Sequence, residues 1–168
     1  MLIFVLNCFK GYSQDTIYWK SCYKLKWEDF LGKPDTISSF EAITSSGIDY
    51  KYFYSDTSFS FTVKSFFDKK NSWKASSANL STLKHEQLHF DITELYARLF
   101  RKRLSEQVKT SADLPVMRTI GKEIMKEWQL EENKYDLETK HSIDEQKQAE
   151  WALSIQKRLD ALQAFSSK

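Results

Sequence analysis

The chain changes character near residue 79, and this change limits the folds that are open to it. Of its 25 Phe, Trp and Tyr residues, 18 lie in residues 1–73, where β-branched residues and Ser/Asp turn signals are also concentrated. Such a composition favours strands. From Asn79 onward, apolar residues recur every three to five positions, which predicts amphipathic helices. We therefore expect an α+β fold in which N-terminal antiparallel strands pack against three C-terminal helices.

The strand-rich half contains three runs that read as strands, at residues 16–27, 42–54 and 58–67. Residues 56–58, Asp-Thr-Ser, form the expected hairpin connection between the last two runs. Between the first two runs, Gly32 and Pro34 interrupt regular structure. Residues 27–34 are therefore predicted to form a surface loop with aromatic anchors.

Three helices are predicted in the second half. The first covers residues 79–104, and the second begins near Leu114-Pro115, since proline is tolerated in a first helical turn. The third is expected to begin at Ser142, because Ser142 and Glu145 have the spacing of a capping box. Towards the end of the second helix, polar groups enter a stripe that is apolar two turns earlier, which indicates a functional site there.

Length and charge exclude several classes of protein. A chain of 168 residues is about one domain long, so a single domain over residues 14–168 is expected. A net charge of +2 gives little attraction to phosphate backbones, which argues against nucleic acid as a partner. No stretch approaches the roughly 20 apolar residues of a membrane span, so none is predicted.

The N-terminus resembles a secretory signal. Residues 2–9 are an apolar run too short to span a bilayer, and Gly11-Tyr12-Ser13 offers a cleavage site between small residues. We expect a signal peptide over residues 1–13 and a secreted, periplasmic or cell-envelope location. The alternatives are an ordinary buried strand and a lipid anchor through Cys8. Cleavage would leave Cys22 as a lone cysteine, without an intramolecular disulfide.

Residues 85–89 read His-Glu-Gln-Leu-His, a HExxH motif inside the strongest helical pattern of the chain. Two histidines four residues apart project from one face of a helix, so His85 and His89 can bind one Zn²⁺. Glu86 is then placed to act as general base on a water molecule. The motif predicts a site for one zinc ion in the first of the three helices.

A catalytic zinc ion takes three protein ligands and leaves one position open. The only other histidine is His141, and Glu138 lies three residues before it, so His141 is the predicted third ligand and Glu138 its rival. Tyr135 is predicted to donate a hydrogen bond to the oxyanion of the transition state, its alternative being a core tyrosine. Asp91 and Glu138 are candidate carboxylates for orienting the imidazoles, the alternative for Asp91 being a solvated side chain.

Several blocks of the sequence match the pattern of a known family. The blocks are Trp27-x-Asp29-Phe30-x-Gly32-x-Pro34, Ala42-Ile43-Thr44-Ser45, Ser72-Trp73, residues 83–92 and Tyr135-Asp136-x-Glu138-Thr139-x-His141. Together they span residues 27–141, and on them the chain resembles the bacterial predicted secreted Zn-dependent proteases, a zincin-like family described as a domain of unknown function. The resemblance implies a zincin-like fold, with His85, Glu86, His89 and His141 as metal ligands and base. A glycine commonly follows the downstream histidine in that family, and Ser142 stands here instead.

These observations lead to one main functional hypothesis and one alternative. The main hypothesis is a secreted zinc peptidase that cleaves a peptide or protein substrate with metal-activated water and Glu86 as general base. The alternative is a non-catalytic envelope protein in which zinc only stabilises the fold. Glu86 favours the peptidase, because a structural zinc site has no need of a base beside its ligands. The oligomeric state is not predicted.

Overall fold

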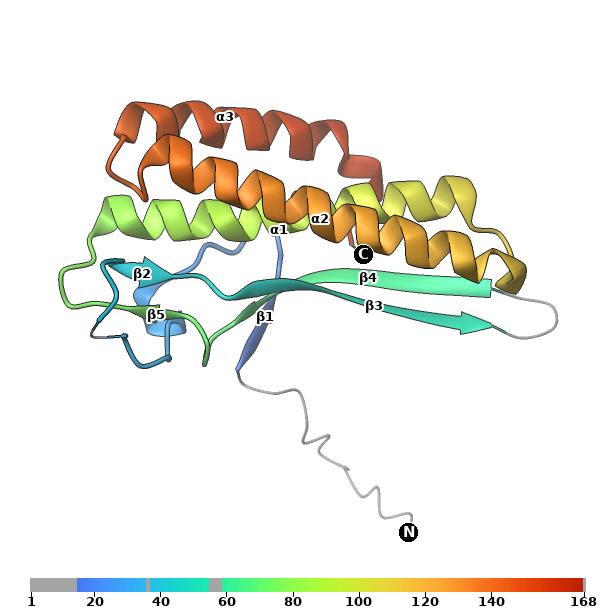
Figure 1. Ribbon diagram of the computed structural model, residues 1–168, viewed down its shortest axis with the longest axis horizontal. Coiled ribbons are helices and arrows are strands. Elements are labelled where there is room, and N and C mark those ends of the chain that lie inside the picture. The colour runs from blue at the N-terminus through green and yellow to red at the C-terminus, as the bar shows by residue number, and fades with distance from the viewer. Residues whose placement is uncertain (1–14, 36, 55–58, 168) are drawn as a thin grey trace, which may run out of the picture.

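The structure is a computed structural model that describes residues 15–35, 37–54 and 59–167. Strands occupy the N-terminal half, and three long helices follow: α1 (Leu80–Gln107), α2 (Leu114–Thr139) and α3 (Glu145–Ala161). Helix α1 lies between the main sheet and α3, with α2 alongside it (Figure 1). The predicted α+β class and the order of its elements are confirmed.

The strands form two separate antiparallel sheets. The larger sheet has the order β1-β4-β3 and contains β1 (Thr16–Tyr18), β3 (Ser46–Tyr54) and β4 (Phe59–Asp68). The smaller sheet pairs β2 (Ala42–Ile43) with β5 (Trp73–Lys74). The expected hairpin turn at 56–58 lies outside the described residues, but the strands on both sides of it pair from Ser46↔Phe67 to Tyr54↔Phe59.

Two predicted strands are wrong in extent. The run 16–27 is a strand only to Tyr18, and a 3-10 helix covers Trp27–Asp29. Asp29 holds this segment folded locally, because its carboxylate accepts hydrogen bonds from the Tyr23 hydroxyl at 2.7 Å and the Lys26 amide at 3.0 Å. The run 42–54 is divided into β2 and β3, since the Ser45 amide between them turns to donate to Ser72 Oγ.

The third helix begins later than predicted. It starts at Glu145 rather than Ser142, and its N-cap is Asp144, whose carboxylate accepts a hydrogen bond from the Lys147 amide. Ser142 has a φ of 77°, so its backbone lies in the left-handed region and cannot open a right-handed helix.

Helix α1 is buried on most of its surface, and several of its charged side chains are paired inside the protein. Glu94 is 1% exposed and accepts hydrogen bonds from Ser65 of β4 and from Arg98 and Arg101 of its own helix. Arg98 in turn donates to the backbone carbonyl of Leu159 in α3. This network ties α1 to the sheet on one side and to α3 on the other.

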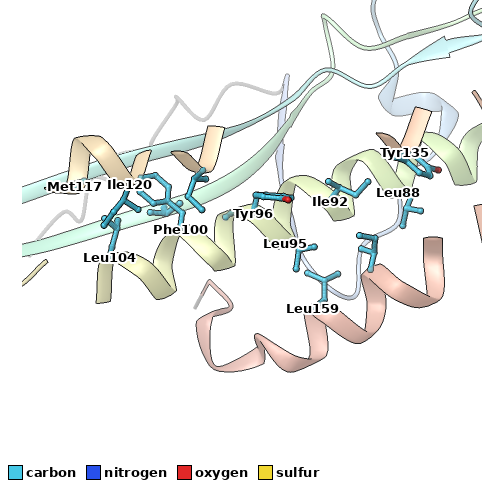
Figure 2. Close-up of a cluster of buried hydrophobic side chains, with 14 of the residues drawn as sticks. Leu88, Ile92, Leu95, Tyr96, Phe100, Leu104, Met117, Ile120, Tyr135 and Leu159 are labelled. Carbon is cyan, nitrogen blue, oxygen red and sulfur yellow. The ribbon is translucent and has the colours of Figure 1, made fainter. Parts of the chain in front are cut away.

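An apolar core fills the space between the three helices and the sheet (Figure 2). From α1 it contains Leu88, Ile92, Leu95, Tyr96, Phe100 and Leu104; Met117, Ile120 and Tyr135 come from α2 and Leu159 from α3. The core runs the length of α1 and ends beside the HExxH turn, so both helices that carry site residues are packed rigidly.

Most of the N-terminal predictions concern residues that the structure does not describe. Residues 1–13, including Cys8, are not among the described residues, so the signal peptide and the lipid anchor stay predictions. Cys22 is an exposed free thiol. Within the described part of the chain, none of the helices combines the length and apolarity that crossing a bilayer requires.

Gly32 is predicted to be irreplaceable for stability. A Cβ atom at Gly32 would lie 2.7 Å from the Ser72 carbonyl oxygen and 2.8 Å from that of Lys70, and backbone cannot yield as a side chain can. We expect Gly32→Ala to lower the free energy of unfolding by about 1–3 kcal/mol in urea denaturation. Gly121→Ala is the matched control: its Cβ would have no neighbour nearer than 3.5 Å, so helix propensity should make it neutral or stabilising. Equal effects of the two substitutions would contradict this packing.

Candidate metal centre

The HExxH turn of α1 lines a pocket of about 150 Å³. The facing wall is the segment that leads into and through β2, and the C-terminal end of α2 closes the pocket. The lining residues are Phe40, Glu41, Ala42, Ile43, Thr44, Thr82, His85, Glu86, His89, Asp136 and His141. The structure thus brings all three histidines of the chain to one pocket.

His85, His89 and Asp136 form a group that could hold a metal ion. The two histidine Nε2 atoms are 3.1 Å apart, and Asp136 Oδ1 lies 3.1 Å from His85 Nε2 and 3.0 Å from His89 Nε2. In a tetrahedral zinc site with ligand bonds of 2.0–2.1 Å, neighbouring ligand atoms are separated by about 3.3 Å. The three atoms are therefore already arranged at nearly the spacing that one small divalent ion imposes.

The helices explain why these atoms converge. His85 and His89 are four residues apart on α1, so they share a face. Helix α2 returns antiparallel to α1, and its last turns carry Trp128, Glu132 and Asp136 at a spacing of four on the side that meets the histidines. The sequence patterns did not assign a role to Asp136 or to Glu132, although Asp136 stands in the Tyr-Asp-x-Glu-Thr-x-His block.

Glu132 orients the imidazole of His89. Its carboxylate makes a short hydrogen bond with His89 Nδ1 and accepts a second from Trp128 Nε1 at 2.6 Å. A carboxylate on the outer nitrogen of a ligating histidine fixes the ring and its tautomer. His85 differs: its Nδ1 is buried without a hydrogen-bond partner among the described residues.

The electrostatics of the cluster favour a cation between the three groups. Burial disfavours the charged form of His89, but its hydrogen bonds to Asp136 and Glu132 outweigh burial and raise its pKa well above the usual value. Burial likewise opposes ionisation of Asp136, yet its hydrogen bonds to His85 and His89 lower the pKa of this carboxyl group. These contacts therefore favour a positive charge in the cluster, whether carried by a proton or by a metal ion.

Glu86 is buried in the same pocket with a free acceptor. The residue is 3% exposed, and its Oε2 has no hydrogen-bond partner among the described residues. Thr44 fixes the backbone at this position, since its hydroxyl donates to the Glu86 carbonyl. A buried carboxylate oxygen without a partner is costly, so a ligand that supplies a proton or a hydrogen bond is expected there.

His141 lies at the rim of the cluster. Its Nδ1 is 3.5 Å from Asp136 Oδ1, its side chain is 49% exposed, and its ring contacts that of Phe40 at a centroid distance of 4.8 Å. Lys140, His141 and Ser142 all have positive φ, from 50° to 77°. Three consecutive left-handed non-glycine residues cost energy, and they turn the chain after α2 so that His141 lines the pocket. Its role as a ligand stays a prediction.

Tyr135 supports the two histidines from beneath. Its ring stacks on His85 at 4.6 Å and meets His89 edge-on at 4.9 Å. Its hydroxyl donates to the His85 carbonyl at 3.3 Å, and burial raises the pKa of the phenol. The structure places this hydroxyl on the backbone and not among the pocket-lining groups, so the predicted oxyanion role gains no support from its position.

The other predicted carboxylates make different contacts. Glu138 accepts a hydrogen bond from Trp151 Nε1 at 2.8 Å and does not line the pocket described here. Asp91 accepts from Trp19 Nε1 and Gln87 Nε2. Among the described residues, the carboxylate that orients an imidazole from outside the cluster is Glu132, and the expectation that Asp91 and Glu138 do so is wrong.

Comparison with protein families gives a match over part of the chain. Residues 60–142 match the family model described as a bacterial protein of unknown function (DUF922). This segment contains nearly all of β4, the HExxH turn, Glu132, Asp136 and His141. Neither the curated proteins nor the solved structures include a significant match. The domain found in the chain therefore agrees with the resemblance drawn from sequence blocks, and its description assigns no activity.

Loss of the Glu132 carboxylate should weaken metal binding. We expect Glu132→Gln to lower zinc affinity by about 10–100-fold, because His89 loses the group that fixes its ring. Zinc competition against a chromophoric chelator measures the change. Glu138→Gln is the matched control, since Glu138 contacts Trp151 instead. A larger loss in Glu138→Gln than in Glu132→Gln would show that the wrong carboxylate has been assigned.

The raised pKa of His89 predicts opposite pH trends for the metal-free and zinc-loaded protein. In the folded metal-free protein, His89 holds its proton above the ordinary value of 6.5, so this stabilisation is present below pH 6.5 and is lost as pH rises through the folded pKa. Zinc competes with the same proton, so its stabilisation grows over that interval. Thermal unfolding between pH 6 and 8, with zinc or with EDTA, should show a widening gap in Tm. A constant gap, or an equal trend in His89→Gln, would contradict the assignment.

Proposed function

We propose that this protein is a zinc-dependent peptidase in which His85, His89 and Asp136 hold one Zn²⁺ and Glu86 is the general base. The observation that carries the proposal is the position of Glu86. Its side chain is buried, has an oxygen without a hydrogen-bond partner among the described residues, and lines the same pocket as His85, His89 and Asp136. A site that only stabilised the fold would gain nothing from this carboxylate and would bear the cost of burying it. His141, in contact with Asp136, is the second candidate for the third ligand.

The chemistry divides between the ion and the protein. A bound Zn²⁺ supplies Lewis-acid chemistry: it lowers the pKa of a water molecule towards about 7 and polarises a carbonyl group. Glu86 accepts a proton from the attacking water molecule while the oxygen of that water forms a bond to the peptide carbonyl carbon. Glu86 then delivers that proton to the amide nitrogen as the carbon–nitrogen bond breaks, so acid and amine are released.

The size of the pocket supports a polymeric substrate. Its volume of about 150 Å³ lies below the roughly 300 Å³ at which pockets for whole small molecules begin. It therefore has room for one side chain or one end of a larger ligand. The wall formed by residues 40–44 includes the short strand β2, whose backbone can align an extended peptide. A peptide or protein substrate fits both features.

The proposed location is the cell envelope or the exterior. It rests on the apolar run and cleavage pattern of residues 1–13. A zinc ion would suit such a protein, since the exposed Cys22 has no disulfide partner among the described residues. The alternative function, a zinc-stabilised binding protein without catalysis, is separated from the peptidase by the following experiment.

Substitution of Glu86 should abolish hydrolysis and spare the metal. We expect Glu86→Gln to retain zinc at one ion per chain by mass spectrometry and to cleave a fluorogenic peptide library at least about 100-fold more slowly. Glu123→Gln, at an exposed position on α2, controls for the loss of one charge. Absence of cleavage by the zinc-loaded wild type on every peptide would overturn the peptidase and favour the binding protein.

A further inference from the structure

The pocket around the candidate metal centre is acidic beyond what metal binding needs. Three carboxylates line it, from Glu41, Glu86 and Asp136, and within the described part of the chain no lysine or arginine does so. With a divalent ion in place, its two positive charges face three negative ones. A ligand that brought another carboxylate would meet no cationic partner, whereas a ligand with a positive charge would complete the balance.

Glu41 is the carboxylate that neither the metal nor the proposed reaction uses. Its backbone carbonyl accepts a hydrogen bond from Ala75 at 2.7 Å, which holds it beside the small sheet. Its Oε2 accepts a hydrogen bond from the Thr82 hydroxyl at 2.7 Å, and Thr82 is a buried residue in the first turn of α1. Oε1 has no hydrogen-bond or ion-pair partner among the described residues. The side chain is thus anchored by one oxygen and free to bind with the other.

We propose that Glu41 selects the substrate, and that the pocket binds a cationic group of a peptide, a protonated amine or a guanidinium. This inference rests on the proposed function, because it assigns the substrate class of the same site. The pocket has the volume for one such group, and the oxygen anchored on Thr82 keeps the carboxylate in place without further ordering cost. Glu41 acts here as a specificity residue and takes no part in proton transfer.

The cation has two chemical sources, a lysine or arginine side chain and a free amino terminus. Three amidated alanine peptides with a fluorescent label distinguish them: an N-acetylated peptide with one central lysine, an N-acetylated peptide with one central glutamate, and a peptide with a free amino terminus and no lysine. Binding is measured by fluorescence anisotropy on zinc-loaded Glu86→Gln protein, which does not consume the peptides and retains Glu41, the carboxylate proposed to bind the cation. We expect at least one cationic peptide to bind about 10-fold or more tightly than the glutamate peptide.

When Glu41→Gln is added to the Glu86→Gln protein, the preference for cationic peptides should disappear. When Glu123→Gln is added instead, the preference should be unchanged. Thr82→Val should reduce it, because Glu41 then loses the donor that anchors it; this variant also serves if circular dichroism shows that Glu41→Gln does not fold. A preference that survives both Glu41→Gln and Thr82→Val, or no preference at all, overturns the inference.

The failure of this inference differs from the failure of the proposed function. Wild-type protein that cleaves lysine and glutamate peptides with equal kcat/KM is a peptidase without this selectivity. Protein that cleaves nothing but binds cationic peptides through Glu41 is a binding protein with this selectivity. The two readouts, cleavage by wild type and anisotropy on Glu86→Gln, therefore test the two proposals independently.

Discussion

A helix that is surrounded on most sides needs partners for the charged side chains that it buries, and this requirement organises the protein. Helix α1 contacts the sheet, α2 and α3, yet it buries charged and polar side chains along its length. Near its middle, Glu94 is neutralised by Arg98 and Arg101. Near its start, His85 and His89 meet Asp136. The cluster of His85, His89 and Asp136 is thus one of several solutions to the same desolvation problem, and beside it Glu86 Oε2 is buried without a partner among the described residues.

The unpaired acceptor separates the site from the structural pairs. Glu94 has all its partners within the protein, so its network holds elements together and binds nothing else. Glu86, in the second turn of α1, has a buried oxygen with no partner among the described residues and faces a pocket. The left-handed turn that carries His141 adds backbone strain at the same place. Unpaired polar groups and backbone strain often mark functional sites, and the Glu86 carboxylate and the strained turn at His141 both border this pocket.

The sequence was sufficient for the features set by local periodicity. The spacing of apolar residues predicted the three helices, and the four-residue spacing of His85 and His89 placed both on one face, as observed. The roles of Glu132 and Asp136 depend on how α2 crosses α1, which local periodicity does not determine. The apolar stripe, continued past Trp128, leads to residues 131, 135 and 138, whereas the row at residues 132 and 136 meets the histidines.

The strand predictions failed where side chains compete with the sheet for backbone donors. Asp29 captures the Lys26 amide and ends the extended run after β1, and Ser72 captures the Ser45 amide between β2 and β3. Ser45 and Ser72 are 27 residues apart in the sequence, so no local pattern predicts the hydrogen bond between them. The position after His141 is different: Ser142 has a left-handed backbone, a conformation that glycine adopts without steric cost.

The central claim is that one divalent ion binds between α1 and the last turns of α2. Anomalous diffraction from crystals of the zinc-loaded protein, recorded on both sides of the zinc absorption edge, tests it most directly. The account predicts one peak at about 2.0–2.2 Å from His85 Nε2, His89 Nε2 and a carboxylate oxygen of Asp136. A peak bound by His141 in place of Asp136 would reassign the third ligand, and zinc located away from His85 and His89 would contradict the account.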